Sequence, residues 1–105
     1  MIYQVVFSRE AEEDLVRMFD FAFERELNSP TGNLEIPTRA IEAIRQGCKF
    51  LAVSPFSCRK GDNSPFVREL IVPFGATGYV VLFEIKTASR VHIGAIRHQR
   101  ESDYH

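Results

Sequence analysis

Hydrophobic and polar residues alternate at the start of the chain and then change to a helical spacing. In YQVVF, residues 3–7, the alternation predicts a first strand with one face more apolar than the other. Ser8 follows as an expected N-cap, and the next six positions hold four acidic residues, which the helix dipole favours there. Apolar residues then recur three and four positions apart, so the pattern predicts an amphipathic helix that ends near Leu27.

A second helical spacing follows the turn-forming sequence NSPTGN. Apolar residues repeat at this spacing over residues 36–51, and Pro37 is tolerated because it falls in the first turn. Two consecutive helices joined by a short loop are expected to form an antiparallel hairpin. The run VSPFSCRKGDNSP, residues 53–65, is rich in turn-forming residues and predicts a loop.

Three short β patterns complete the chain: FVRELIV at 66–72, YVVLFEI at 79–85 and RVHIGAI at 90–96. The linkers PFGATG and KTAS are short enough for hairpins, so we expect an antiparallel meander. The order β-α-α-β-β-β predicts an α+β fold, with the helical hairpin packed on one face of an antiparallel sheet. A chain of 105 residues is long enough for one core and too short for two, which predicts a single domain over residues 1–105.

Simple alternation divides the side chains of the last predicted strand between two faces. One side is aliphatic and is expected to meet the helices: Val91, Ile93 and Ala95. The other side is expected to face outward: Arg90, His92, Gly94, Ile96 and His98. This arrangement would place both histidines on the open face of the sheet.

Composition indicates a globular cytoplasmic protein. Hydrophobic residues make up 45% of the chain and charged residues 26%, which are ordinary values for a folded domain. No apolar run approaches the roughly 18 residues of a membrane span, and the N-terminus turns acidic at once, so we expect no membrane association. The two cysteines lack paired metal spacing and are expected to be reduced, one buried on the second helix and one in the loop.

Charge differs between the two halves of the chain. Residues 1–50 carry six basic and nine acidic residues, a net charge of −3, whereas residues 51–105 carry seven basic and five acidic residues, a net of +2. Any anionic partner is therefore expected to meet the C-terminal half. The total of −1 is unlike the strongly basic character of a dedicated nucleic-acid-binding domain.

The last ten residues, IRHQRESDYH, gather two Arg, two His, two carboxylates and a Tyr behind the last strand. A metal site would draw on His92, His98, Asp103 and His105, but their spacings match no known ligand pattern and His105 is terminal. We therefore expect no metal and no other cofactor. A catalytic site, a docking surface and a solvated tail stay open as explanations of this cluster.

Four segments in order, FSREAEEDL, VREL, GYVVLFEI and IRHQRESDY, resemble the RelE/ParE superfamily of small type II toxins, also called plasmid stabilisation proteins. The resemblance covers almost the whole chain. It implies a growth-inhibiting toxin with the fold described above, neutralised by a small antitoxin, with a DNA-binding region, that is encoded beside it. It is compatible with a homodimer or a toxin–antitoxin heterotetramer.

RelE-like members of this superfamily cut messenger RNA on the ribosome. For such an activity, the resemblance implies catalytic roles for three residues of this chain. Arg68 in VREL would hold a phosphate, His98 would transfer a proton during attack by a 2′-hydroxyl, and Tyr104 would stack on a base or help move a proton. Such an enzyme would be a metal-independent endoribonuclease. Structural roles are the alternative: Arg68 pairing with an acidic neighbour, and His98 and Tyr104 serving as ordinary tail residues.

ParE-like members share the fold and inhibit DNA gyrase by protein binding, with no catalytic residue. Two departures from the RelE-like pattern favour this branch: Val80 stands where many members have Arg, and the loop before Phe66 offers only two basic residues. The residues expected to bind the target are Arg59, Lys60, Arg90, His92, Arg97 and Arg100. An inactive homologue that only binds its antitoxin is a third alternative.

Overall fold

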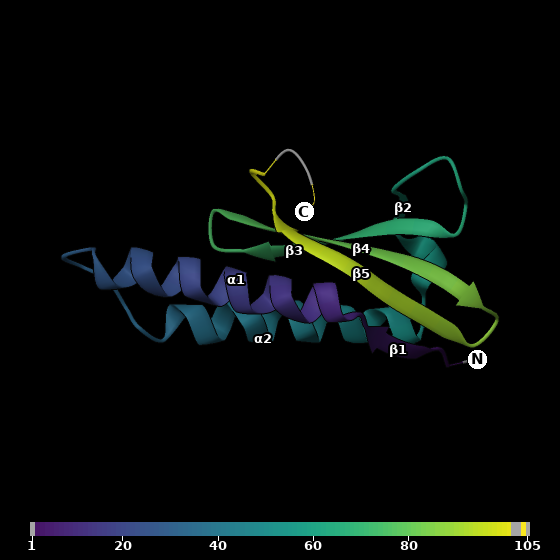
Figure 1. Ribbon diagram of the computed structural model, residues 1–105, viewed down its shortest axis with the longest axis horizontal. Helices are drawn as coiled ribbons and strands as arrows, with labels where there is room; N and C mark the ends of the chain where they lie inside the picture. Colours follow the sequence, from purple (N-terminus) through teal and green to yellow (C-terminus); the bar gives the residue numbers. More distant parts are fainter. Residues whose placement is uncertain (1, 102–103, 105) are drawn as a thin grey trace.

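The computed structural model describes residues 2–101 and 104. A two-helix hairpin lies along one face of a five-stranded sheet (Figure 1). The principal elements are β1 (Gln4–Phe7), α1 (Arg9–Leu27), α2 (Ile36–Lys49), β3 (Val67–Phe74), β4 (Thr77–Thr87) and β5 (Arg90–His98). Between α2 and β3 lie two short 3₁₀ helices, η1 (Phe50–Ala52) and η2 (Pro55–Ser57), and the two-residue strand β2 (Arg59–Lys60).

Helix α1 begins and ends where the sequence predicts. The Ser8 hydroxyl accepts a hydrogen bond from the Ala11 N–H at 3.0 Å, which is the contact of an N-cap. The helix ends at Leu27, and the Asn28 N–H closes its last turn on the Glu24 carbonyl. Local signals in the sequence are therefore sufficient to define this element.

The sheet has the order β1-β5-β4-β3-β2. Strands β3, β4 and β5 form the predicted antiparallel meander, whereas β1 pairs with β5 in parallel. The sheet is therefore mixed, and the expectation of a wholly antiparallel sheet is corrected at this edge, because the helical hairpin and the meander return β5 alongside β1 in the same direction. The α+β class, with the helices on one face, is confirmed. The predicted loop contains β2, whose residues pair with Arg68 and Glu69.

A β-bulge at Gly94 interrupts the regular alternation of β5. Leu82 of β4 pairs with Ala95, and the next residue, Phe83, pairs with Ile93, so Gly94 has no partner position on β4. One extra residue in a strand reverses the faces of all the side chains that follow it. Residues before the bulge therefore face as predicted, and those after it face the other way.

This reversal corrects the predicted faces of the end of β5. Ile96 is 1% exposed in the core under the helices, and His98 lies opposite Tyr79, another core residue. The prediction that Ile96 and His98 face outward, and that Ala95 faces the helices, is wrong because the bulge inserts one residue. The Asp14 carboxylate of α1 accepts a hydrogen bond from the Ile96 N–H at 2.8 Å, just past the bulge.

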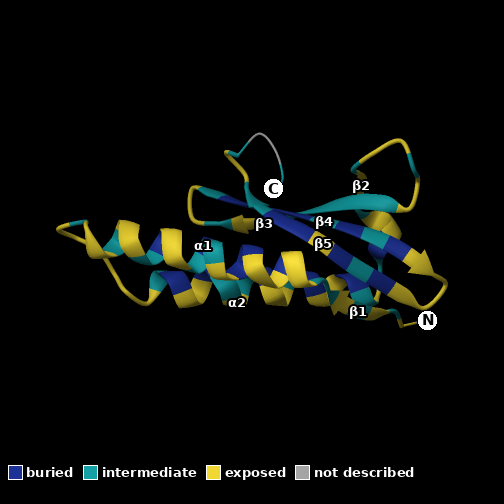
Figure 2. Cartoon of the chain, viewed as in Figure 1, coloured by how far each residue is buried: buried dark blue, intermediate teal, exposed yellow. Residues whose placement is uncertain are grey.

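The core lies between the sheet and the helical hairpin. Its largest fully buried side chains include Phe83, Ile44, Leu51 and Ile93, contributed by both layers. The molecule measures 48 × 25 × 24 Å because the hairpin projects beyond the sheet, and this projecting end is largely exposed (Figure 2). No helix in the described part of the chain is long and apolar enough to cross a membrane.

Candidate functional site

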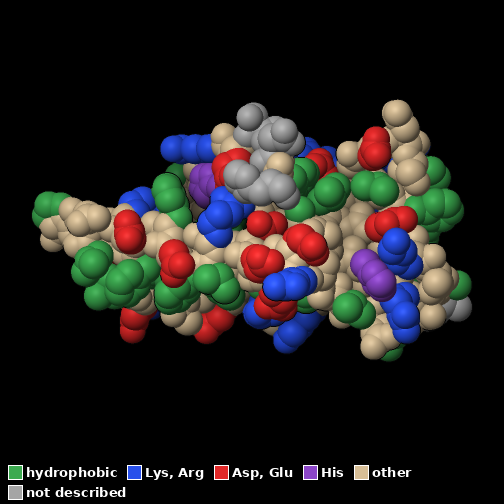
Figure 3. Space-filling view, in the orientation of Figure 1, with side chains coloured by type: hydrophobic (Ala, Val, Ile, Leu, Met, Phe, Trp, Pro, Cys, Tyr) green, Lys and Arg blue, Asp and Glu red, His purple; other side chains and the backbone are tan. Residues whose placement is uncertain are grey.

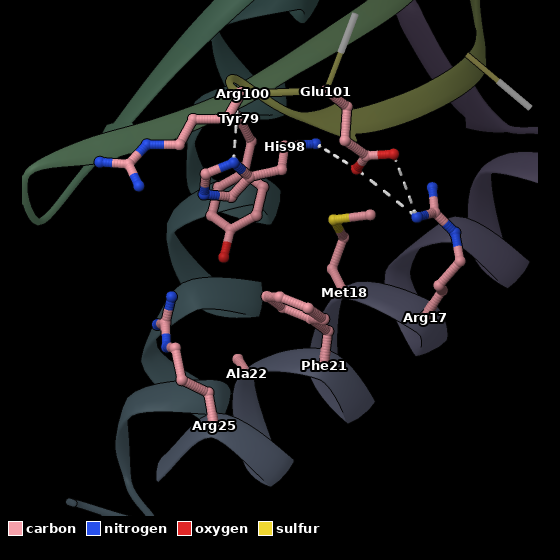
Figure 4. Close-up of a pocket in the computed structure, with 9 residues that line it drawn as sticks. All are labelled: Arg17, Met18, Phe21, Ala22, Arg25, Tyr79, His98, Arg100 and Glu101. Carbon is pink, nitrogen blue, oxygen red and sulfur yellow. Dashed lines mark hydrogen bonds and ion pairs between the residues drawn. The ribbon is translucent and has the colours of Figure 1, made fainter. Parts of the chain in front are cut away.

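A groove opens beside the point where α1 leaves the sheet (Figure 4). It has a volume of about 700 Å³. Its apolar floor comes from Met18, Phe21 and Ala22 of α1, and Tyr79 of β4 and His98 of β5 form one wall. Four charged residues complete the lining: Arg17, Arg25, Arg100 and Glu101. The groove thus combines an apolar surface with an excess of positive charge.

His98 is held by hydrogen bonds at both ring nitrogens. Its Nδ1 accepts the backbone N–H of Arg100 at 3.1 Å, so the neutral ring carries its proton on Nε2 and donates it to the Thr77 hydroxyl at 3.1 Å. Burial, and then the positive charge of Arg100, lower the pKa of His98 below its ordinary value of 6.5. His98 is therefore neutral at physiological pH.

A network of charged groups fixes the end of β5 to α1. Arg17 lies 3.5 Å from the Asp14 carboxylate and 3.4 Å from that of Glu101, and Glu101 accepts the backbone N–H of His98 at 2.9 Å. The sequence pattern did not predict Arg17 and Glu101 as site residues, and it explained Asp14 only as charge near the helix start. The position of Asp14 on the apolar stripe of α1, next to Leu15, is the signal that could have identified it.

Tyr104, which follows β5, contacts the opposite, open face of the sheet. The Tyr104 hydroxyl donates a hydrogen bond to the Glu69 carboxylate at 2.7 Å, and Arg59 donates to the same carboxylate at 2.9 Å. The guanidinium of Arg97 lies 5.1 Å from the centre of the Tyr104 ring and donates to the Glu101 carbonyl at 2.6 Å. Burial and the Glu69 hydrogen bond raise the pKa of Tyr104 well above its ordinary value of 10.

Arg68 has a structural role in this chain. Its guanidinium donates to the carbonyls of Pro65 at 2.7 Å and Cys58 at 2.9 Å, and lies 5.4 Å from the centre of the Phe56 ring. These contacts hold the loop between η2 and β3. The predicted structural alternative, a pair between Arg68 and an acidic neighbour, is wrong because Glu69 points to the other face, where it pairs with Arg59.

The three residues of the RelE-like alternative do not come together. Arg68 lies opposite Phe83 and His98 opposite Tyr79, and both of these partners belong to the core, so both side chains are on the helix-facing side at separate positions of the sheet. Tyr104 contacts the open face. Each of the three is already engaged in hydrogen bonds within the protein.

The predicted target-binding residues are spread over several surfaces. Arg97 is on the open face and Arg100 lines the groove. His92 lies opposite Glu84 on the open face, and Arg90 is exposed at the start of the same strand. Arg59 and Lys60 form the exposed edge strand β2.

No group of three metal-ligating side chains lies in the described part of the chain. Two of the four residues considered as a metal site, Asp103 and His105, lie outside the described residues. The other two, His92 and His98, lie on opposite faces of the sheet because the bulge at Gly94 separates them.

Comparison with known proteins connects this architecture to a family. The family model described as "ParE toxin of type II toxin-antitoxin system, parDE" matches residues 5–103. The chain belongs to the ParE toxin family. A solved structure, "Chromosomal ParDE TA system from P. aeruginosa", is similar to the toxin with a TM-score of 0.68 over 92% of this chain and 96% of that chain, at 18% sequence identity. No curated protein sequence matches the toxin.

Membership of this family confirms the resemblance to RelE/ParE toxins and the preference for the ParE-like branch. The chain is the toxin of a type II toxin–antitoxin system, and the family implies a cognate antitoxin as its partner. The similar solved structure confirms the α+β fold of this chain.

Proposed function

We propose that this toxin inhibits DNA gyrase by binding it, without a catalytic residue of its own. The observation that carries the proposal is the dispersal of Arg68, His98 and Tyr104 over two faces of the sheet, each of them already making hydrogen bonds within the protein. A toxin that acts by binding needs no such constellation. Gyrase acts on DNA in the cytoplasm, so we place the toxin there as well.

The chemistry of these three residues supports binding over RNA cleavage. A general acid or base must reach its substrate with a free nitrogen or oxygen, and both ring nitrogens of His98 are occupied. The raised pKa of Tyr104 disfavours its use as a base near neutral pH. Arg68 donates to backbone carbonyls, so it has less capacity to hold a phosphate.

We propose that Arg97, at the end of β5, together with Arg100 and Tyr104 after it, forms the centre of the gyrase-binding surface. Arg97 and Arg100 flank the end of the strand, and Tyr104 lies beneath Arg97. Arg and Tyr are among the residues most often found at interface hot spots. Arg59 adjoins this segment through Glu69, and Lys60, Arg90 and His92 stay predicted contacts at its margin.

Inhibition of supercoiling by purified gyrase tests the proposal. We expect the full-length toxin to inhibit gyrase, and a variant lacking Arg100–His105 to inhibit it at least about tenfold less, because truncating hot-spot residues commonly costs 2 kcal/mol or more. The deleted residues lie beyond the last strand, since β5 ends at His98. Arg100→Ala, which keeps the contacts of Glu101 and Tyr104, separates loss of binding from loss of local structure. Equal inhibition by the full-length toxin and the deletion variant would show that residues 100–105 do not contribute to gyrase inhibition.

The RelE-like alternative makes a different prediction for ribosome-bound messenger RNA. Removing a general acid or base should reduce cleavage by about 100-fold or more, so a nuclease would lose its cuts on substitution of His98→Ala or Tyr104→Ala. We expect the unsubstituted toxin to produce no such cuts. Site-specific cleavage that disappears with His98→Ala would overturn gyrase binding as the proposed function.

The oligomeric state, a homodimer or a toxin–antitoxin heterotetramer, stays a prediction that light scattering would test.

A further inference from the structure

Glu69 of β3 lies on the open face of the sheet and contacts the segment that follows β5. Its Oε2 accepts a hydrogen bond from the Tyr104 hydroxyl at 2.7 Å, and its Oε1 accepts one from Nε of Arg59 at 2.9 Å. The Glu69 side chain is only 14% exposed, so it offers little surface of its own to a partner. We infer that Glu69 is a positioning residue, which holds Tyr104 in the conformation that meets gyrase. The inference rests on the proposed function and adds the residue that shapes the binding surface.

The Tyr104 side chain bridges β3 and β5 across the open face. Its hydroxyl contacts Glu69 of β3, and its ring centre lies 5.1 Å from the guanidinium of Arg97 in β5, so the side chain crosses β4, which runs between them. Val80 of β4 pairs with Arg97 and is 1% exposed, although it lies outside the core under the helices. A valine on a face without helices is buried only where another segment covers it, and the position of Tyr104 across β4 explains this burial.

The hydrogen bond to Glu69 fixes the far end of the segment after β5. The near end is set by Arg97, whose guanidinium donates to the Glu101 carbonyl at 2.6 Å. A hydrogen bond to a carboxylate is stronger than one between neutral groups, so Glu69 is an effective anchor. Burial and the Glu69 hydrogen bond raise the pKa of Tyr104, so the hydroxyl keeps its proton and stays a donor at physiological pH.

A segment that is not held at Tyr104 would find other partners. Acidic and basic side chains lie close together around the end of β5 (Figure 3), so a released segment can form alternative ion pairs. Gyrase would then have to order the segment on binding, and that ordering lowers affinity. Glu69 therefore raises affinity by preorganising the binding surface rather than by contacting the target.

Two matched substitutions on the open face test this role in the gyrase supercoiling assay. Glu84 is the control, because it carries the same charge on the same face but pairs with Lys86, at 3.1 Å. We expect Glu69→Ala to weaken inhibition by about five- to tenfold, as the loss of a hydrogen bond to a charged group does, and Glu84→Ala to change it less than about twofold. Glu69→Gln keeps an oxygen acceptor for Tyr104 and should inhibit within about twofold of the unsubstituted toxin.

A double-mutant cycle connects the effect of Glu69 to Tyr104. Tyr104→Phe removes the same hydrogen bond and should weaken inhibition about as much as Glu69→Ala does. Because both changes break one interaction, adding Glu69→Ala to Tyr104→Phe should cost no more than about another twofold.

Tryptic cleavage after Arg100, followed by mass spectrometry, reports on the segment without gyrase. Cleavage requires local opening of the chain, so we expect it to be about threefold faster or more in Glu69→Ala and Tyr104→Phe, and unchanged in Glu84→Ala. Urea denaturation of the same variants shows whether the whole fold has changed. If Glu69→Ala lowers overall stability, Tyr104→Phe and Glu69→Gln carry the comparison.

The outcomes separate the role of Glu69 from gyrase inhibition itself. Equal inhibition by Glu69→Ala and Glu84→Ala, an equal loss with Glu69→Gln and Glu69→Ala, or independent losses in the cycle would overturn the positioning role while leaving gyrase as the target. Unchanged tryptic cleavage in Glu69→Ala would overturn it as well. Failure of the unsubstituted toxin to inhibit gyrase would overturn both the proposed function and this inference.

Discussion

The two halves of α1 have similar apolar content but very different surroundings. In the first half, Ala11, Leu15 and Met18 are buried under the sheet and Val16 is exposed, whereas in the second half only Ala22 is buried, and Phe21 and Leu27 are 67% and 58% exposed. The sheet ends before the helix does, so the same kind of residue builds the core in one half and forms an uncovered surface in the other (Figure 2). Helical periodicity therefore predicts which apolar residues share one face of α1, but the length of the sheet determines which of them are buried and stabilise the fold.

Alanine substitutions should affect stability very differently in the two halves of α1. Leu15 is 3% exposed, and we expect Leu15→Ala to lower the free energy of unfolding by about 3 kcal/mol because it leaves a cavity in the core. Phe21→Ala should change that free energy by less than about 0.5 kcal/mol, as exposed substitutions usually do. Urea denaturation of both variants measures the difference, and equal losses would contradict the division of α1 into a core half and a surface half.

The Asp14 carboxylate connects α1 to the backbone of β5 through a hydrogen bond from the Ile96 N–H. Asp14→Ala leaves the buried Ile96 N–H without its acceptor, and we expect a loss of about 2 kcal/mol in the free energy of unfolding. Asp14→Asn keeps an oxygen acceptor at this position and should lose clearly less. Denaturation curves that rank Asn as the more damaging change would show that the charge, rather than the hydrogen bond, is the stabilising feature.

The smallest predicted effect concerns His98 at the wall of the groove. Its pKa is lower in the folded protein than the ordinary 6.5, so the unfolded chain binds more protons as pH falls through 6.5. The free energy of unfolding should therefore decrease with falling pH, from just above 6.5 down to the folded pKa. His98→Gln should lose this part of the pH dependence. An unchanged slope in thermal melts between pH 7 and 5 would argue against the neutral, doubly hydrogen-bonded His98.

Most of the fold could be predicted because its signals are local. The Ser8 cap, the end of α1 at Leu27 and the antiparallel meander follow from periodicity and turn residues. The bulge at Gly94 could not be derived by alternation, since it depends on how β5 is aligned with β4. A glycine within a strand is a known sign of a bulge, but it does not say whether one forms.

The candidate site was predicted by residue type rather than by arrangement. The density of Arg, His and Tyr in the C-terminal segment predicts a candidate site there. Its contacts could not, because Arg17 and Glu101 are 84 positions apart and Tyr104 and Glu69 are 35 apart. Such pairs form only when packing brings distant segments together, and the single-residue shift at Gly94 determined that His98 faces α1 and not the open face.

Induction of the toxin without its antitoxin tests the central claim, that the protein acts by binding gyrase. DNA-damage signalling and the rate of protein synthesis would be followed in the same culture during the first minutes after induction. We expect damage signalling to rise while protein synthesis continues, and Arg100→Ala to delay the rise. An early collapse of protein synthesis without damage signalling would contradict it.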